Sequence, residues 1–193
     1  MDQSSRFGAA LFLILPFVLP AAHAESHPID TEKSVLTVRA YKSGVLSAFG
    51  NDHEISAPIE SGTVDTTAHK VELRVRAAAL RVHDPKASEK DRDEIQKTML
   101  GPEVLDTAQH AEIVFRSTDA KDAGDGVWHV RGELTLHGTT KPVVVNVTER
   151  NGHYTGTAQL KQTDFGIRPV KVAGGTVRVK DEVRIEFDIQ LAR

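Results

Sequence analysis

Histidine is the residue type in this chain with the most chemistry to offer, because the 193 residues include nine histidines and no cysteine. Without cysteine the chain forms no disulfide, offers no thiolate to a metal and has no thiol nucleophile. The histidines make no His-x-His pair and no HExxH motif, which are spacings typical of zinc sites. We therefore predict no metal site.

Two pairs of an aspartate and a histidine stand out, Asp52-His53 and His83-Asp84. If the segments that carry them are loops at one mouth of the same fold, the four side chains come together. Such a cluster suits a metal or proton-relay site, or hydrogen bonds that simply hold the two loops. The sequence leaves both interpretations open, and the second is the simpler one.

Motifs of the common enzyme classes are missing from the sequence. There is no Gly-x-Ser-x-Gly, no Gly-x-Gly-x-x-Gly and no phosphate-binding P-loop. A Ser-His-Asp triad assembles in space and not in sequence, but no residue here stands out as a nucleophile. We predict no catalytic residue and no enzymatic activity.

The first 24 residues have the features of a secretory signal. Arg6 precedes an apolar run over residues 7–20, and Ala-His-Ala at residues 22–24 is a small-x-small cleavage sequence. The run of about 14 residues is short for a bilayer span, and an uncleaved membrane anchor is the alternative. We expect a signal peptide over residues 1–24, one mature domain over residues 25–193, and export to a bacterial periplasm. The formal net charge of −3 indicates no broad basic surface for nucleic acid.

Most of the mature chain alternates apolar and polar residues, which is the pattern of half-buried β-strands. The last strand is the clearest, because Val183, Ile185 and Phe187 share one face while charged residues occupy the other. About eight such segments predict an all-β domain, either a sandwich or an eight-stranded antiparallel barrel. Pro58 and Gly132 interrupt two of the patterns, so bulges or bends are expected there.

One segment, residues 88–101, has the pattern of a short helix among these strands. Ser88 is a good N-cap with Asp91 three residues later, and Gly-Pro at residues 101–102 ends the helix. An apolar stripe should face the strands, formed by Ile95, Met99 and Leu100. We expect this helix to be a lid over the mouth of the barrel.

Several short segments, in their order along the chain, resemble the YceI-like family. The most specific is Gly-Glu-Leu-Thr-Leu-His-Gly-Thr-Thr-Lys-Pro-Val at residues 132–143. The others are Ser-Ala-Phe-Gly-Asn-Asp-His at residues 47–53, the segments at residues 81–84, 91–93, 99–100 and 113–117, and Thr-Asp-Phe-Gly-Ile at residues 163–167. The resemblance implies an exported bacterial protein with an eight-stranded antiparallel lipocalin-like β-barrel that binds a polyisoprenoid.

The sequence departs from the family pattern at two places. Asn51 stands where many relatives in this branch have histidine, which weakens the expectation of a histidine-based site in that loop. Gln109-His110 replaces an aromatic-proline pair ahead of a strand.

The ligand that the resemblance implies is an isoprenoid lipid or quinone with its prenyl tail inside the barrel. Each buried CH₂ contributes about 0.8 kcal/mol, so some twenty carbons offset an association cost of about 4–15 kcal/mol. A dry apolar channel therefore suffices for binding, with no further cofactor. The candidate residues of the barrel lining and mouth are Phe49, His53, Val75, Leu100, Leu105, Phe115, Trp128, Leu134, Phe165 and Phe187. By the family pattern Phe49 and Phe165 lie in loops at the mouth, and Trp128 could sit near a polar head group because a buried indole N–H needs a partner.

Two hypotheses follow for the function. The first is a carrier or sequestering protein for an isoprenoid lipid or quinone. The second is an interaction or redox-accessory module with a filled barrel, which acts through the loop of Asp52-His53 beside a membrane electron-transfer partner. A homodimer is compatible with either, and nucleic acid is a partner of neither.

Overall fold

The computed structural model describes residues 25–43, 52–172 and 177–192. The expected signal peptide and Phe49 lie outside the described residues. The elements are β1 (Ser26–Pro28), β2 (Val35–Ser43), β3 (His53–Ser56), β4 (Ile59–Asp65), β5 (Lys70–Arg76), a 3₁₀ turn η2 (Ala77–Ala79), β6 (Arg81–Val82), α1 (Glu89–Leu100), β7 (Glu112–Gly124), β8 (Val127–Leu136), β9 (Thr139–Arg150), β10 (His153–Lys161), a 3₁₀ turn η3 (Gln162–Phe165), β11 (Lys171–Val172) and β12 (Val177–Gln190).

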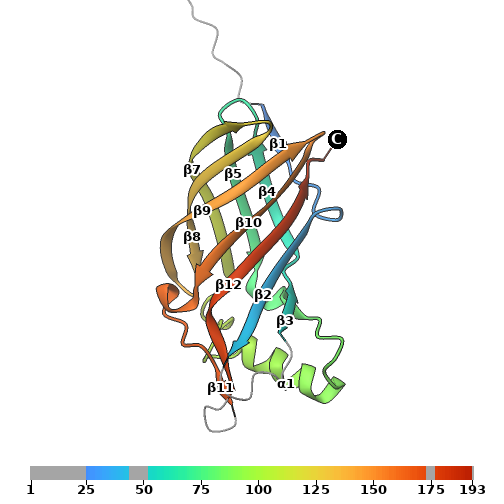
Figure 1. Ribbon diagram of the computed structural model, residues 1–193, viewed down its shortest axis with the longest axis vertical. Helices are drawn as coiled ribbons and strands as arrows, with labels where there is room; N and C mark the ends of the chain where they lie inside the picture. Colours follow the sequence, from blue (N-terminus) through green and yellow to red (C-terminus); the bar gives the residue numbers. More distant parts are fainter. Residues whose placement is uncertain (1–24, 44–51, 173–176, 193) are drawn as a thin grey trace, which may run out of the picture.

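The strands form one antiparallel sheet that curls into a barrel (Figure 1). Neighbours along the sheet follow the order β1-β4-β5-β7-β8-β9-β10-β12-β2-β3-β6, and β11 pairs with β12 beside this path. Ile29, just after β1, bridges Leu191, just after β12. The curled sheet therefore brings β1 next to the end of β12. The expectation of a mainly β, antiparallel domain with one helix is confirmed.

The expected count of eight strands is not confirmed, because the described part of the chain contains twelve strand segments. Ala57-Pro58 separates β3 from β4, since proline has no N–H to donate to a neighbouring strand. The 3₁₀ turn η2 separates β5 from β6. These two breaks let β3 pair with β2 and β6, while β4 pairs with β1 and β5.

The alternation along β12 sorts its side chains as the sequence predicts. Val183, Ile185 and Phe187 point into the barrel, where they line its cavity. Glu186 lies on the outer face and accepts a hydrogen bond from Arg39 Nε of β2 at 2.7 Å. Ion pairs of this exposed kind stabilise the fold little, so the inward face carries most of the stabilisation.

The bulge expected at Gly132 of β8 lies in the neighbouring strand β7. The register passes from Ser117 opposite Gly132 to Asp119 opposite Arg131, so the extra residue is in β7 and not in β8. A Cβ on Gly132 would lie 2.5 Å from the ring of Phe115. Glycine is needed here because the ring of Phe115 and the carbonyl of Arg116 occupy the space that a side chain would take.

Helix α1 lies across the end of the barrel where β3 and β6 meet (Figure 1). Ser88 caps it as predicted, because its Oγ accepts the N–H of Asp91 at 3.1 Å. The Gln96 side chain ties the helix to the sheet by accepting the N–H of Val82 at 2.9 Å and donating to the carbonyl of Leu80 at 2.8 Å. Among the described residues, no helix is long and apolar enough to cross a membrane.

Candidate functional site: an apolar cavity inside the barrel

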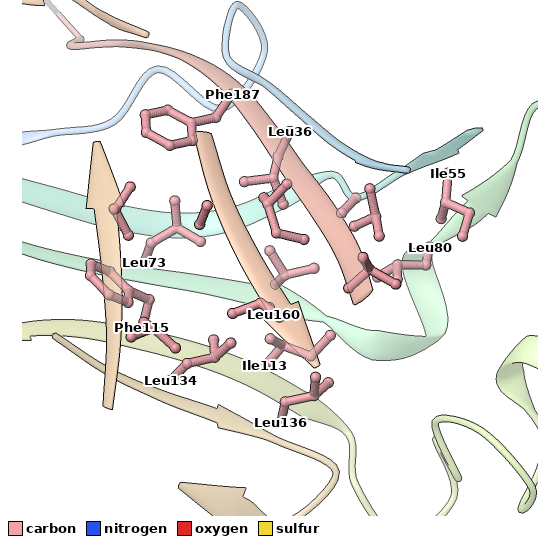
Figure 2. Close-up of a pocket in the computed structure, with 18 of the residues that line it drawn as sticks. Leu36, Ile55, Leu73, Leu80, Ile113, Phe115, Leu134, Leu136, Leu160 and Phe187 are labelled. Atoms are coloured by element: carbon pink, nitrogen blue, oxygen red, sulfur yellow. The ribbon is translucent and has the colours of Figure 1, made fainter. Parts of the chain in front are cut away.

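The interior of the barrel holds a partly open cavity of about 790 Å³. This volume lies within the range of roughly 300–1,000 Å³ that is typical of small-molecule sites. Figure 2 shows the side chains of several strands pointing into the same space. The lining is largely aliphatic and aromatic, and it includes Leu36, Val38, Ile55, Leu73, Val75, Leu80, Ile113, Phe115, Leu134, Leu136, Val143, Val145, Leu160, Ile185 and Phe187.

The empty space follows from the size of the inward residues. The apolar residues that strand β9 contributes to the lining are all valines, at positions 143, 145 and 147. Its neighbour β10 places Ala158 opposite Val145. Because these side chains are short, they do not reach across the barrel, and the interior is not filled by protein. A filled barrel is therefore not what the sequence forms.

Seven of the ten candidate residues line this cavity: His53, Val75, Leu105, Phe115, Trp128, Leu134 and Phe187. Leu100 and Phe165 do not, and Phe49 lies outside the described residues. Leu100 follows Met99 on α1, so it is rotated by about 100° from the face that meets the cavity. It packs against the core instead.

Phe165 differs from its expected place at the mouth. It ends the 3₁₀ turn η3 and is only 1% exposed, within the core of the domain. The glycine that follows it adopts φ 75°, which turns the chain sharply and directs the ring inwards. Phe165 therefore supports the cavity wall and does not line it.

Leu36, Val38 and Leu80 also line the cavity, although they are not among the residues predicted from the sequence. Leu36 and Val38 alternate with polar residues along β2, so period-2 spacing was the signal that could have identified them. Leu80 follows the 3₁₀ turn η2, and no periodic pattern leads to it.

The two ends of the cavity are polar. Near α1 the lining includes Lys42, Arg178, Asp91 and Glu94, which are two cations and two anions. The opposite end includes Asp65, His69 and Glu149. Trp128 lies at this opposite end, where its indole ring stacks on His69 with 4.5 Å between ring centroids.

Tyr154 brings a phenol to the cavity lining. Burial raises the pKa of its hydroxyl above the usual value, and the nearby carboxylate of Glu149 raises it further. The group therefore stays a neutral hydrogen-bond donor over the physiological pH range.

The predicted convergence of the two Asp-His pairs is confirmed, although only two of the four residues pair with each other. His53 Nδ1 lies 2.5 Å from Asp84 Oδ2. His83 Nε2 lies 2.9 Å from the hydroxyl of Ser56, and Asp52 accepts the N–H of Lys42 at 3.0 Å. Within the described ranges, no group of three or more His, Asp or Glu residues is arranged to hold a metal ion.

Comparison with known proteins gives consistent results. A family model described as a YceI-like domain matches residues 28–191. A UPF0312 protein of Vibrio cholerae serotype O1 (strain M66-2) is 28% identical over 192 residues, covering 93% of this chain and 94% of that protein. A UPF0312 protein of Shewanella baltica is 29% identical over 161 residues, covering 77% of this chain and 80% of that protein.

Among solved structures, the crystal structure of BcnA from Burkholderia cenocepacia matches with a TM-score of 0.62 at 20% sequence identity. The match covers 86% of this chain and 99% of that one. At this level of identity the likeness concerns the fold.

Proposed function

Because this chain belongs to the YceI-like family, we propose that it is a non-enzymatic binding protein that holds an isoprenoid amphiphile inside its barrel. The ligand is a polyprenyl lipid or an isoprenoid quinone. Its prenyl tail occupies the apolar cavity, and its head group lies at a polar end. The proposal includes export, so that the mature domain acts in the periplasm, and it includes no other cofactor.

The observation that carries the proposal is the apolar cavity of about 790 Å³ inside the barrel. At roughly 30 Å³ for each carbon-sized unit, the share of volume that one liquid water occupies, it holds about 25 carbon atoms. That corresponds to about five isoprene units.

The lipocalin-like description of the fold also belongs to this proposal. Counting β3 with β4 and β5 with β6 as two interrupted strands leaves eight long strands, with β1 and β11 as short additions. Support comes from the breaks themselves, since one is two residues long and the other four. A barrel of eight strands is the size that holds one small ligand.

The redox-accessory alternative required a filled interior, and the cavity argues against that part of it. A quinone ligand would still need to reach its place of use. We therefore include a membrane electron-transfer protein as a partner of the carrier, and a homodimer is compatible with this function.

The experiment is native mass spectrometry of the mature protein purified from its own periplasm, followed by organic extraction. The expected result is an added mass that extracts as a prenyl lipid or quinone. Leu134→Glu places a charge in the cavity and should abolish retention of the lipid. Thr135→Glu places the same side chain on the outer face of β8 and should leave retention unchanged. A bare mass that stays bare after incubation with quinones and polyprenols would refute the carrier function.

A further inference from the structure

Asp84 is a carboxylate that the fold buries next to the cavity wall. Its side chain is only 1% exposed. One carboxylate oxygen lies 2.5 Å from His53 Nδ1, and the other accepts the N–H of Glu54 at 3.0 Å. Burying a carboxylate is costly unless it is paired and hydrogen-bonded. The burial of Asp84 is therefore coupled to the position of the His53 ring.

The backbone around Asp84 holds it in place independently of His53. His83 donates its N–H to the carbonyl of Glu54 at 2.7 Å. On the other side Arg92 of α1 donates to the carbonyl of Ala87 at 2.5 Å. The loop that carries Asp84 is thus attached to both β3 and the lid helix. Asp84 is placed to orient His53, and not the reverse.

His53 lines the cavity near α1 whereas Asp84 does not, so the ring edge that does not contact Asp84 is the one left for the cavity. The side chain of His53 is 12% exposed, and it lines the cavity beside Ala40, its partner residue on β2. Within the described part of the chain, Nε2 has no hydrogen-bond partner. A hydrogen bond from Nδ1 to a carboxylate fixes the neutral imidazole in the form whose Nε2 is an acceptor.

The charges around this end do not favour an anionic head group. Lys42 and Arg178 are balanced by Asp91 and Glu94, and Asp84 adds a buried carboxylate. A phosphate would need an excess of cations. A neutral head group that donates a hydrogen bond fits both the charge balance and the acceptor on His53.

We infer that His53, positioned by Asp84, is the head-group contact and selects ligands that carry a hydroxyl over those that carry only carbonyl or ether oxygens. The protein would then discriminate the reduced, hydroquinone form of an isoprenoid from its quinone form. This inference rests on the proposed function, because it assumes that the tail lies in the cavity. His53 contacts the ligand, and Asp84 is a positioning residue.

The test compares a prenylated phenol with its methyl ether, which have the same tail and differ only in the ability to donate. Binding is followed by the fluorescence of Trp128, the one tryptophan of the chain, which lines the cavity. A net hydrogen bond is worth about 0.5–1.5 kcal/mol, so the wild type should prefer the phenol by roughly 2- to 13-fold. The ether binds through its tail alone.

His53→Phe should abolish this preference while the ether keeps its affinity. His129→Phe, on the exposed outer face of β8, is the matched control and should keep the preference. Asp84→Asn should weaken the preference and change the nitrogen-15 chemical shifts of the His53 ring, because an amide does not hold one tautomer as a carboxylate does. Preference retained in His53→Phe, or equal loss of both ligands in that variant, would overturn the inference. Failure of the wild type to bind either ligand would refute the proposed function itself, and the inference with it.

Discussion

The length of the bound tail should depend on the volume that strand β9 leaves empty, and Val145→Phe tests this. Val145 lines the cavity and faces Ala158 on β10 and Val130 on β8, which are short side chains with room beside them. Phenylalanine adds four carbon atoms to valine. At roughly 30 Å³ each they remove about 120 Å³ from the cavity, which is close to one isoprene unit.

The expected result is a shift of the preferred tail by about one isoprene unit, measured as affinity across a series of prenyl alcohols of increasing length. A tail that no longer fits leaves about four carbons unburied, which costs about 3 kcal/mol and lowers its affinity about 200-fold. The melting temperature of the empty protein should stay the same or rise, because the new ring fills space and does not displace neighbours.

Val144→Phe is the matched control for this experiment. Val144 is the next residue on β9, points outwards and is 54% exposed, so the same ring added there does not enter the cavity. An unchanged length preference in folded Val145→Phe, or an equal shift in Val144→Phe, would refute the assignment of the cavity as the tail site.

Three further predictions concern stability. Ser88→Ala should lower the free energy of unfolding by about 1 kcal/mol through loss of the α1 N-cap, seen as faster hydrogen exchange in the helix; unchanged exchange would contradict this. Phe165→Ala should cost about 3–5 kcal/mol in urea denaturation without changing ligand selectivity, because the ring supports the wall; altered selectivity would place it in the site. Desolvation acts to raise the pKa of Asp181, but hydrogen bonds from the hydroxyl and N–H of Thr163 outweigh it and lower the pKa. The stabilisation by Asp181 is present above its unfolded pKa of about 3.9 and is lost as pH falls below it, so the difference in melting temperature between wild type and Asp181→Asn should narrow from pH 7 to pH 3; a constant difference would contradict the sign.

Much of this fold was accessible from local sequence patterns. The alternation along β12 predicted which residues face inwards, and the N-cap at Ser88 predicted where the helix begins. Both depend on residues within a few positions of each other. The buried position of Phe165 was not accessible, because it depends on how η3 packs against β9, β10 and β12.

The candidate site was likewise predictable from the sequence only in part. The Asp-His pairs were visible in the sequence, but the choice of Asp84 over Asp52 as the partner of His53 depends on the pairing of β3 with β6. That pairing joins segments about thirty residues apart, and no local pattern encodes it. The volume of the cavity was inaccessible for the same reason, since it depends on eight or more segments at once.

The pairing of β2 with β12 has a consequence for how the chain is made. Val38 lies opposite Ile185, so one edge of the first long strand pairs with β3 while its other edge waits for the last strand. Contacts this distant in sequence form slowly, because the intervening chain must be ordered first. During synthesis the wall of the barrel is incomplete until β12 leaves the ribosome, and the apolar inner face stays uncovered until then. Exposed apolar surface and unpaired strand edges make a nascent chain in this state prone to aggregation.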